Sequence, residues 1–241
     1  MNLITLQTNI LEDFEQNLLK LKKLINKAPK NSLILASELA LSGYSYKDMK
    51  KASKISLKAK KELLELSKDK TIALTLIIEE NNNFFNRFFL FSNNKIVHTQ
   101  DKYRLFELGE ETNYFKAPNS DEKIKIFNVK GLKIATLICF ELRFTQYWER
   151  LKGADIILIP AMWGKNRKEH FETLTRALAI ANQCYVIASN SAYKECCKSS
   201  AIITPFGEVI KDDRKEFISL NFEKQQIKKM RKYLKVGIEN E

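Results

Sequence analysis

The chain alternates between short runs of aliphatic side chains and longer stretches in which leucine or isoleucine returns every third or fourth position. The first pattern is typical of buried β-strands and the second of amphipathic helices. The patterns predict strands over residues 3–7, 32–37, 71–78, 84–91, 95–98, 133–138, 155–160, 184–189, 201–204, 208–211 and 215–222. They predict helices over residues 10–28, 47–68, 145–152 and 168–182, followed by a basic helix or tail over residues 223–241.

Two pairs of predicted strands lie close enough in the chain to form hairpins. Ser92-Asn93-Asn94 separates one pair and Pro205-Phe206-Gly207 separates the other, and both connections contain turn-forming residues. The chain shows no internal repeat, low-complexity block or linker. Mixed strands with helices between them predict one α/β domain whose sheets are covered by helices.

Composition narrows the class of protein. A chain of 241 residues with 44% hydrophobic side chains can bury a sizeable core, and 7 Gly and 4 Pro are too few for a disordered or fibrous chain. With 2 His, the sequence excludes a metal site built on several histidines. No apolar run approaches the ~20 residues that span a bilayer, and the opening MNLITLQTN lacks a basic leader with an apolar core. We therefore expect a cytoplasmic protein with no membrane partner.

The formal net charge of +12 suggests a nucleic-acid partner until the positions of the lysines are considered. They lie in amphipathic stretches such as residues 18–30 and 47–70, where they alternate with core positions. No aromatic side chains interleave with them as a platform for stacked bases would require. We therefore expect a solvated lysine-rich face and no nucleic acid. A non-catalytic basic module that binds RNA or an acidic partner stays open as the alternative.

The four cysteines do not form a recognisable metal or redox motif. Cys139, Cys184, Cys196 and Cys197 contain no C-x-x-C pair, and the adjacent Cys196 and Cys197 lack partners at metal-site spacing. Free thiols are expected, with Cys184 a small buried hydrophobe inside its strand. Neither a metal nor an organic cofactor is predicted.

Three polar residues directly follow predicted strands. Glu38 follows SLILAS, Lys102 follows KIVHTQD and Cys139 follows KIATLI. Taken alone, each has an ordinary explanation: a helix cap or solvated turn, an exposed lysine, and a packed thiol. Together at strand ends they suggest a cleft, although composition and periodicity leave both interpretations open.

The local sequences favour the cleft. ASELALSGYSYKDM, QDKYRLFELGEETNYF and KIATLICFELRF resemble the Glu-, Lys- and Cys-bearing segments of the nitrilase superfamily of carbon–nitrogen hydrolases. ADIILIPAMW, HFETLTRALAIANQCYVIASN and SSAIITPFGEVI are similar to the later segments of that family, in the same order. Three separated motifs in order are far more specific than one short motif, and the resemblance spans about residues 3–211.

The resemblance implies roles for individual residues. Glu38 would be the general base, Lys102 the stabiliser of the transition state and Cys139 the nucleophile. The second acid of the family would fall on Glu111, with Glu110 as the alternative. The resemblance also implies a single-domain αββα sandwich over residues 1–241, a homodimer, and catalysis without a cofactor.

The chemistry of the residues agrees with these roles. A cysteine attacks as thiolate, and an ordinary pKa of ~8.5 leaves only a few per cent ionised at neutral pH. A strand-to-helix turn would expose the sulfur of Cys139, and the helix N-terminus would favour its negative charge. Lys102 and the backbone N–H of Phe140 would bind the tetrahedral oxyanion.

The substrate is less well determined. Tyr44, Phe140, Met162 and Trp163 lie in segments that would approach the pocket, although they could equally be core residues. ELALSGYSYKDM resembles the amidase half of glutamine-dependent NAD synthetases, EETNYF resembles carbamoyl-putrescine amidases, and QDKYRLF resembles omega-amidases. The chain departs from the usual family residues at Glu141, Thr145, Gln146, Leu178 and Ala181. We therefore predict a small linear amide or carbamoyl compound as substrate, with a nitrile as the less favoured alternative.

Overall fold

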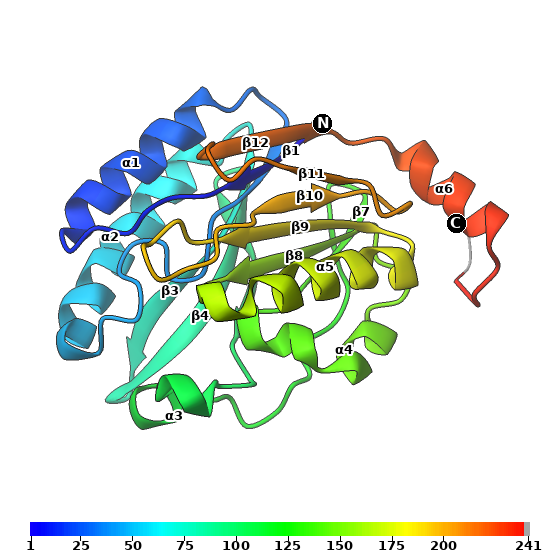
Figure 1. Ribbon diagram of the computed structural model, residues 1–241. Coiled ribbons are helices and arrows are strands. Elements are labelled where there is room, and N and C mark those ends of the chain that lie inside the picture. Colours follow the sequence, from blue (N-terminus) through cyan, green and yellow to red (C-terminus); the bar gives the residue numbers. More distant parts are fainter. Residues whose placement is uncertain (239–241) are drawn as a thin grey trace.

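The computed structural model of the chain describes residues 1–238, which form two six-stranded mixed sheets packed face to face (Figure 1). The first sheet has the order β12-β1-β2-β3-β4-β5 and the second the order β11-β10-β9-β8-β7-β6. The strands of the first sheet are β1 (Asn2–Leu6), β2 (Ser32–Leu35), β3 (Thr71–Glu80), β4 (Asn83–Ser92), β5 (Lys95–Asp101) and β12 (Phe217–Asn221). Those of the second are β6 (Phe127–Val129), β7 (Leu132–Thr136), β8 (Ile156–Ala161), β9 (Tyr185–Asn190), β10 (Ala201–Ile203) and β11 (Val209–Lys211).

Each sheet has a parallel centre and antiparallel edges. The strands β1, β2 and β3 pair in parallel, as do β7, β8 and β9, whereas the outer strands pair antiparallel to them. The carboxyl ends of parallel strands meet at one edge of a sheet, so the segments after β2 and β7 are placed where the two sheets can share a site.

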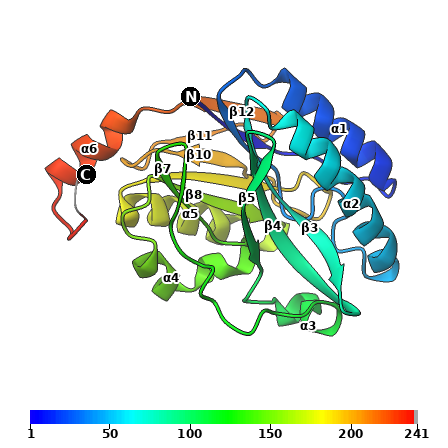
Figure 2. The ribbon, with the colours of Figure 1, turned by 180° about the vertical axis from the view of Figure 1, so that it is seen from behind.

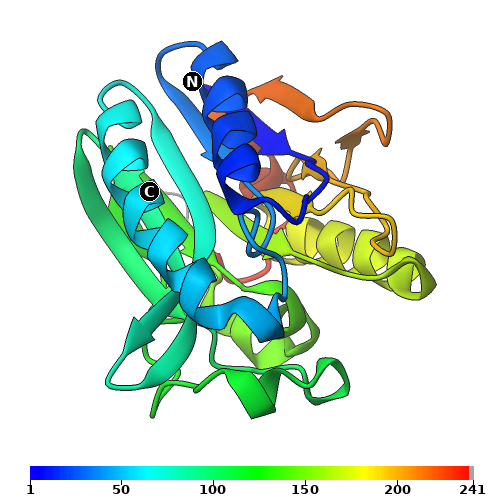
Figure 3. The ribbon, with the colours of Figure 1, turned by 90° about the vertical axis from the view of Figure 1, so that its left-hand side faces the viewer.

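Helices cover the outer face of each sheet. The helices α1 (Phe14–Lys27) and α2 (Met49–Leu66) lie side by side over the first sheet, in front of it in Figure 3, with α5 (Lys168–Asn182) on the other side of the molecule. The short α4 (Thr145–Arg150) lies beside α5. Figure 2 shows α3 (Glu111–Tyr114) and α6 (Lys224–Tyr233) at opposite ends of the molecule. The architecture is the predicted αββα sandwich in a single domain.

Alternation along the strands divides the core into two layers. In β2, Leu33 and Leu35 face the second sheet, whereas Ile34 packs in the cluster under α1 and α2. In β1, Leu3 and Ile4 divide between the same two layers. Because successive side chains of a strand point to opposite faces, these continuous apolar runs are strands buried on both sides.

The predicted strands and long helices are all present, with local differences. The first helix begins at Phe14, not at residue 10, because the Asp13 side chain caps it by accepting the N–H groups of Glu15 and Gln16. The predicted tail forms α6 up to Tyr233, and residues 239–241 of that tail lie outside the described residues. The strand β6 and the helix α3 were not predicted, since each has too few residues to establish a period.

Among residues 1–238, none of the helices combines the length and the apolar character needed to cross a membrane.

Candidate active site

The structure brings Glu38, Lys102, Glu111 and Cys139 together at one edge of the sandwich. Glu38 follows β2 and Lys102 directly follows β5, both in the first sheet, whereas Cys139 follows β7 in the second. Glu38 is 0% exposed, Lys102 1%, Glu111 2% and Cys139 7%. Four buried polar residues from separate segments form one cluster, as the sequence predicted.

Lys102 lies at the centre of this cluster. Its Nζ donates to Oε1 of Glu38 at 2.9 Å and to Oε1 of Glu111 at 2.7 Å. A third hydrogen bond, of 3.0 Å, joins Nζ to the hydroxyl of Tyr44. A buried ammonium is stable only when it is paired and hydrogen-bonded, and here all three of its protons have an acceptor.

The charge of Lys102 is held in place by its neighbours. Burial alone lowers the pKa of this lysine, but Glu38, Cys139 and Glu111 outweigh burial and raise the pKa above its ordinary value. The side chain is therefore an ammonium throughout the physiological pH range. Burial also raises the pKa of Glu111, and the positive charge of Lys102 opposes this rise.

Cys139 opens the 3-10 turn Cys139–Arg143 and has a left-handed backbone, with φ of 51°. A non-glycine residue in this conformation is strained, and such strain is concentrated at functional sites. Burial raises the pKa of the thiol well above its ordinary value, Glu38 adds to the rise and Lys102 opposes it. The expected exposed sulfur with a charge-favouring helix N-terminus is therefore wrong, because the turn is one short 3-10 segment and the thiol is buried.

The two carboxylate oxygens of Glu38 differ in their hydrogen bonds. Its Oε1 accepts from Lys102 and from Nδ2 of Asn86, the latter at 2.9 Å. Its Oε2 is buried and has no hydrogen-bond partner among the described residues. A buried oxygen without a donor is costly to maintain, so this atom is available to accept a proton.

Asn86 was missed by sequence analysis. It lies on β4, 1% exposed, and its backbone oxygen also accepts the N–H of Lys102 at 2.9 Å. The signal that could have revealed it is a buried amide within the otherwise apolar and aromatic run NFFNRFFLFS.

The structure distinguishes the two adjacent acids of the Lys-bearing segment. Glu111 opens α3 and reaches Lys102, and its Oε1 also accepts from the hydroxyl of Tyr44 at 2.7 Å. Glu110 is exposed, in a left-handed conformation before the helix. Tyr44 is therefore part of the polar cluster as well as a wall of the pocket.

A cavity of about 300 Å³ opens onto Cys139. All four residues predicted to line the pocket do so: Tyr44, Phe140, Met162 and Trp163. Seven further side chains, from loops and short 3-10 turns, were not predicted: Tyr46, Phe106, Arg143, Arg167, Tyr193, Glu195 and Cys196. Six of the fifteen lining residues are aromatic, and four are charged.

Two arginines bring positive charge to the cavity. The guanidinium of Arg143 lies 4.6 Å from the Trp163 ring centre, and that of Arg167 lies 5.1 Å from the Phe106 ring centre. Neither forms an ion pair with a carboxylate within the described part of the chain. Burial, and then Arg167, lower the pKa of Arg143. Glu195 also lines the cavity, and Glu111 is paired with Lys102, so the two guanidiniums are the groups that could bind an anionic part of a ligand.

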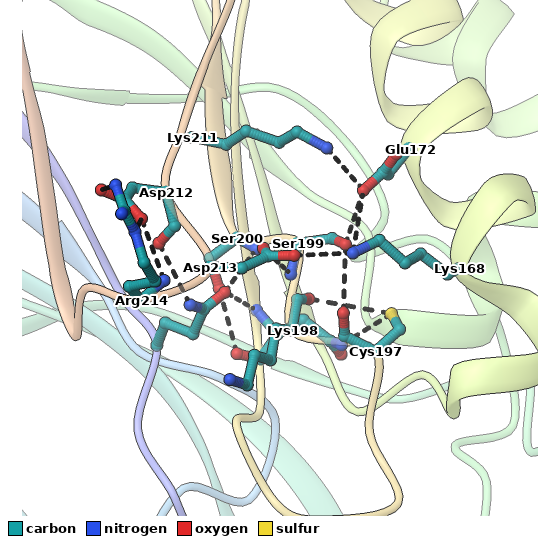
Figure 4. Close-up of polar contacts among 12 residues, drawn as sticks. Lys168, Glu172, Cys197, Lys198, Ser199, Ser200, Lys211, Asp212, Asp213 and Arg214 are labelled. Atoms are coloured by element: carbon teal, nitrogen blue, oxygen red, sulfur yellow. Dashed lines mark hydrogen bonds and ion pairs between the residues drawn. The ribbon is translucent and has the colours of Figure 1, made fainter.

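A polar network anchors one wall of the cavity to α5 (Figure 4). Glu172 accepts from Lys211 and from the hydroxyl of Ser199, both at 2.7 Å. Asp213 accepts from Lys168 at 2.6 Å and from the N–H of Ser199 at 3.0 Å. These contacts hold the end of the loop that carries Tyr193 and Cys196.

The fold and the cluster define a class: an αββα sandwich with a buried lysine, two glutamates and a cysteine at the strand ends. A profile of the carbon-nitrogen hydrolase family matches residues 5–220. The chain therefore belongs to the carbon-nitrogen hydrolase family, whose chemistry is hydrolysis at a carbon–nitrogen bond.

Curated relatives include amidases. The 2-oxoglutaramate amidase of Bacillus subtilis (strain 168) is 27% identical over 213 residues, covering 83% of this chain and 81% of that enzyme. The omega-amidase YafV of Escherichia coli (strain K12) is 33% identical over 144 residues, covering 58% of this chain and 55% of that protein.

Solved structures share the fold at low sequence identity. Nit3 of Saccharomyces cerevisiae superposes with a TM-score of 0.84 at 19% identity, covering 98% of this chain and 95% of that one. The amidase from Nesterenkonia sp. AN1, with an acetamide moiety added covalently at its active-site cysteine, gives 0.81 at 15% identity and covers 97% of both chains. These likenesses establish the sandwich.

Proposed function

We propose that this protein is an amidase that hydrolyses the terminal amide of a small linear acid through a thioester on Cys139. The observation that carries the proposal is Lys102, held as an ammonium between Glu38 and Glu111 at a cavity that opens onto the thiol. This arrangement supplies a nucleophile, a base and a positive charge for the oxyanion within one buried site.

The first half of the reaction forms the thioester. Oε2 of Glu38 takes the proton of the Cys139 thiol as the sulfur attacks the amide carbon. The backbone N–H of Phe140 binds the resulting oxyanion, and the positive charge of Lys102 stabilises it. Glu38 then gives its proton to the nitrogen, the carbon–nitrogen bond breaks, and ammonia leaves.

The second half releases the acid. Glu38 takes a proton from water, the hydroxide attacks the thioester carbon, and the carbon–sulfur bond breaks to release the carboxylic acid. Glu38 then returns the proton to the sulfur, which restores the thiol and the carboxylate. Glu111 and Tyr44 hold Lys102 throughout, so the positive charge keeps its place while the charge on the substrate oxygen changes.

The substrate we propose carries a carboxylate at the end remote from its amide. Arg143 and Arg167 lie at the cavity without carboxylate partners, and aromatic walls suit a short methylene chain. The names 2-oxoglutaramate amidase and omega-amidase of the two relatives agree with such a substrate. A carbamoyl compound or a nitrile is the alternative. A carbamoyl compound would release carbon dioxide together with ammonia, whereas a nitrile gives the same acid and ammonia as the amide and is tested by supplying it as the substrate.

The test is ammonia release from the monoamide of glutaric acid, compared with the uncharged amide of pentanoic acid. Replacing Cys139 by Ala is expected to lower kcat by at least about 10³-fold for both substrates. Arg143→Gln and Arg167→Gln are expected to raise KM about 10- to 100-fold for the charged amide alone, since a charged hydrogen bond contributes about 1.5–3 kcal/mol. Full activity of Cys139→Ala would refute the mechanism, and equal effects on both amides would refute the carboxylate.

The rival, a basic module that binds RNA, has less support. Lysines of α1 and α2 pair with acids, as half-buried Lys22 does with Glu62 at 2.6 Å and exposed Lys58 with Glu15 at 2.5 Å. Such pairs describe a solvated face whose charge is partly neutralised. RNA binding that falls steeply with salt, together with no ammonia release, would favour the rival.

We also propose that the protein works as a cytoplasmic homodimer, as the family resemblance implies. Ile180 on α5 and Phe206 in the β10–β11 turn are 41% and 50% exposed, and such side chains suit a protein interface. Light scattering should give twice the chain mass of 28.0 kDa; a mass of one chain would refute the dimer.

A further inference from the structure

Glu141 is a buried carboxyl group that the proposed reaction does not use. It lies two residues after Cys139 in the same 3-10 turn and is 0% exposed. A carboxylate in such a place costs several kcal/mol unless donors surround it, so the groups it accepts from explain why it is there.

Its two oxygens bind two different segments of the site. Oε1 accepts the backbone N–H of Tyr103 at 2.7 Å, and Oε2 accepts the backbone N–H of Ile138 at 2.8 Å. Tyr103 follows Lys102 and Ile138 precedes Cys139. One carboxyl group therefore bonds to the immediate neighbour of the lysine and to the immediate neighbour of the cysteine.

These segments belong to different sheets. Lys102 continues β5 of the first sheet, and Cys139 follows β7 of the second, so no ladder of backbone hydrogen bonds fixes one against the other. Gln100 adds a weaker link, since its Nε2 lies 3.4 Å from both Oε2 of Glu141 and the backbone oxygen of Thr136. Glu141 supplies the short bonds across this gap.

We propose that Glu141 is a positioning residue that fixes the separation between Nζ of Lys102 and Sγ of Cys139 by holding the backbones beside them. The inference rests on the proposed amidase function, because turnover is its readout. Both contacts are N–H donors, so the clamp requires a group that only accepts. A misplacement of about 1 Å at a reacting pair can lower the rate about 100-fold, so loss of the clamp acts on kcat.

The test compares two substitutions that separate charge from shape. Gln has the shape of Glu but turns an N–H₂ group toward one of the two backbone N–H donors, whereas Asp keeps the carboxylate and loses a methylene. We expect Glu141→Gln to lower kcat at least about 10-fold with KM within about 3-fold, and Glu141→Asp to retain more kcat than Glu141→Gln. A packing role predicts the reverse order, since Gln fills the site better.

A second pair of variants and a control variant test whether misfolding explains the result. Comparing kcat of Glu141→Asn with that of Glu141→Asp repeats the comparison of an amide with a carboxylate in shorter side chains. The proposal can therefore still be tested if Glu141→Gln does not fold. Asp155→Asn is the matched control, because Asp155 is 3% exposed and accepts the N–H of Lys133 at 2.9 Å, at the start of β7 and not at its catalytic end. It should lower the melting temperature and leave kcat unchanged.

The outcomes are distinct. Equal kcat for wild type and Glu141→Gln would overturn the inference while leaving the amidase proposal standing. So would a loss of kcat in Asp155→Asn equal to that in Glu141→Gln, or a higher kcat for Gln than for Asp. An inactive wild type that also releases no ammonia from any amide would instead refute the proposed function on which the inference rests.

Discussion

The Cys139 thiol keeps its proton in the resting protein because of the groups around it. Burial, Glu38 and Glu111 raise its pKa, and Lys102 lowers it without reversing the balance. At neutral pH the thiolate fraction is therefore smaller than that of an ordinary cysteine. The nucleophile is formed when Glu38 takes the proton during attack, and not before substrate binds.

Alkylation by iodoacetamide should reveal this raised pKa. Because each pH unit below the pKa lowers the thiolate fraction about tenfold, the labelling rate of Cys139 should climb from pH 7 to pH 9 without levelling. Lys102→Met removes a group that lowers the pKa of Cys139, so Cys139 should be labelled more slowly at every pH in this variant. Peptide mapping of the alkylated protein gives the rates.

Cys184 serves as the internal control, since it is 0% exposed and burial raises its pKa to about 12. It should stay unlabelled over the same range. A labelling rate of Cys139 that does not change between pH 7 and pH 9, or that increases in Lys102→Met, would contradict the claim that the thiol is protonated in the resting protein.

Single residues differ in how well sequence could identify them. Glu38, Lys102 and Cys139 were found because each lies in a motif directly after a strand. Asn86 and the clamp formed by Glu141 were not, because their partners are backbone groups and side chains distant in sequence. Contacts between segments 38 to 48 residues apart are set by the sheet order, which local patterns do not contain.

At the scale of elements, the turn after β2 depends on the neighbouring strand β3. Leu39 follows Glu38 with a left-handed φ of 47°, and its N–H donates to Oγ1 of Thr75 at 2.8 Å in the buried interior. This hydroxyl holds the turn that aims the Glu38 side chain. A strained conformation at a buried position persists only when its surroundings fix it.

Thr75→Val should therefore harm both stability and turnover. Valine has the shape of threonine but leaves the buried N–H of Leu39 without an acceptor, at a cost of about 1–3 kcal/mol in the free energy of unfolding. Release of the turn should also lower kcat by moving Glu38. Urea unfolding and ammonia release measure the two effects.

Thr136→Val is the matched control. The Thr136 hydroxyl donates to the backbone oxygen of Leu158 at 3.0 Å, and that oxygen also accepts the N–H of Leu137 at 3.0 Å. The acceptor keeps one partner after substitution, so the loss of stability should be smaller than for Thr75→Val. Equal losses in the two variants would show that the Leu39 contact does not matter.

The elements themselves were largely predictable, because long apolar runs and leucine spacing report burial directly. The β3–β4 hairpin shows where prediction stopped: its turn is made by Asn81 and Asn82, both with positive φ, between strands longer than their apolar runs. The C-terminal end of β3, Glu79 and Glu80, is exposed and polar, so hydropathy does not mark it. Pairing extends a strand beyond the residues that bury it.

At the scale of the molecule, α3, which carries Glu111 of the site, lies at one end and α6 at the other (Figure 2). The helix buries Ile227 and Met230, and Arg231 donates to the backbone oxygen of Ala154 at 2.7 Å. Gln183 also donates to the backbone oxygen of Leu234 at 2.7 Å. The helix α6 is thus a packed part of the fold.

Deleting the chain from residue 224 onward should separate stability from activity. Exposing the surfaces that Ile227 and Met230 cover should lower the free energy of unfolding by about 3–6 kcal/mol, since burial of each side chain contributes about 1.5–3 kcal/mol. The value of kcat well below the melting temperature should stay within about twofold of wild type, because α6 contributes no side chain to the cavity. Lys228→Glu, an exposed change on the same helix, should leave both quantities unaltered. A truncated protein that keeps its melting temperature but loses turnover would contradict this prediction. It would show that the C-terminal segment affects the site and does not act on stability alone.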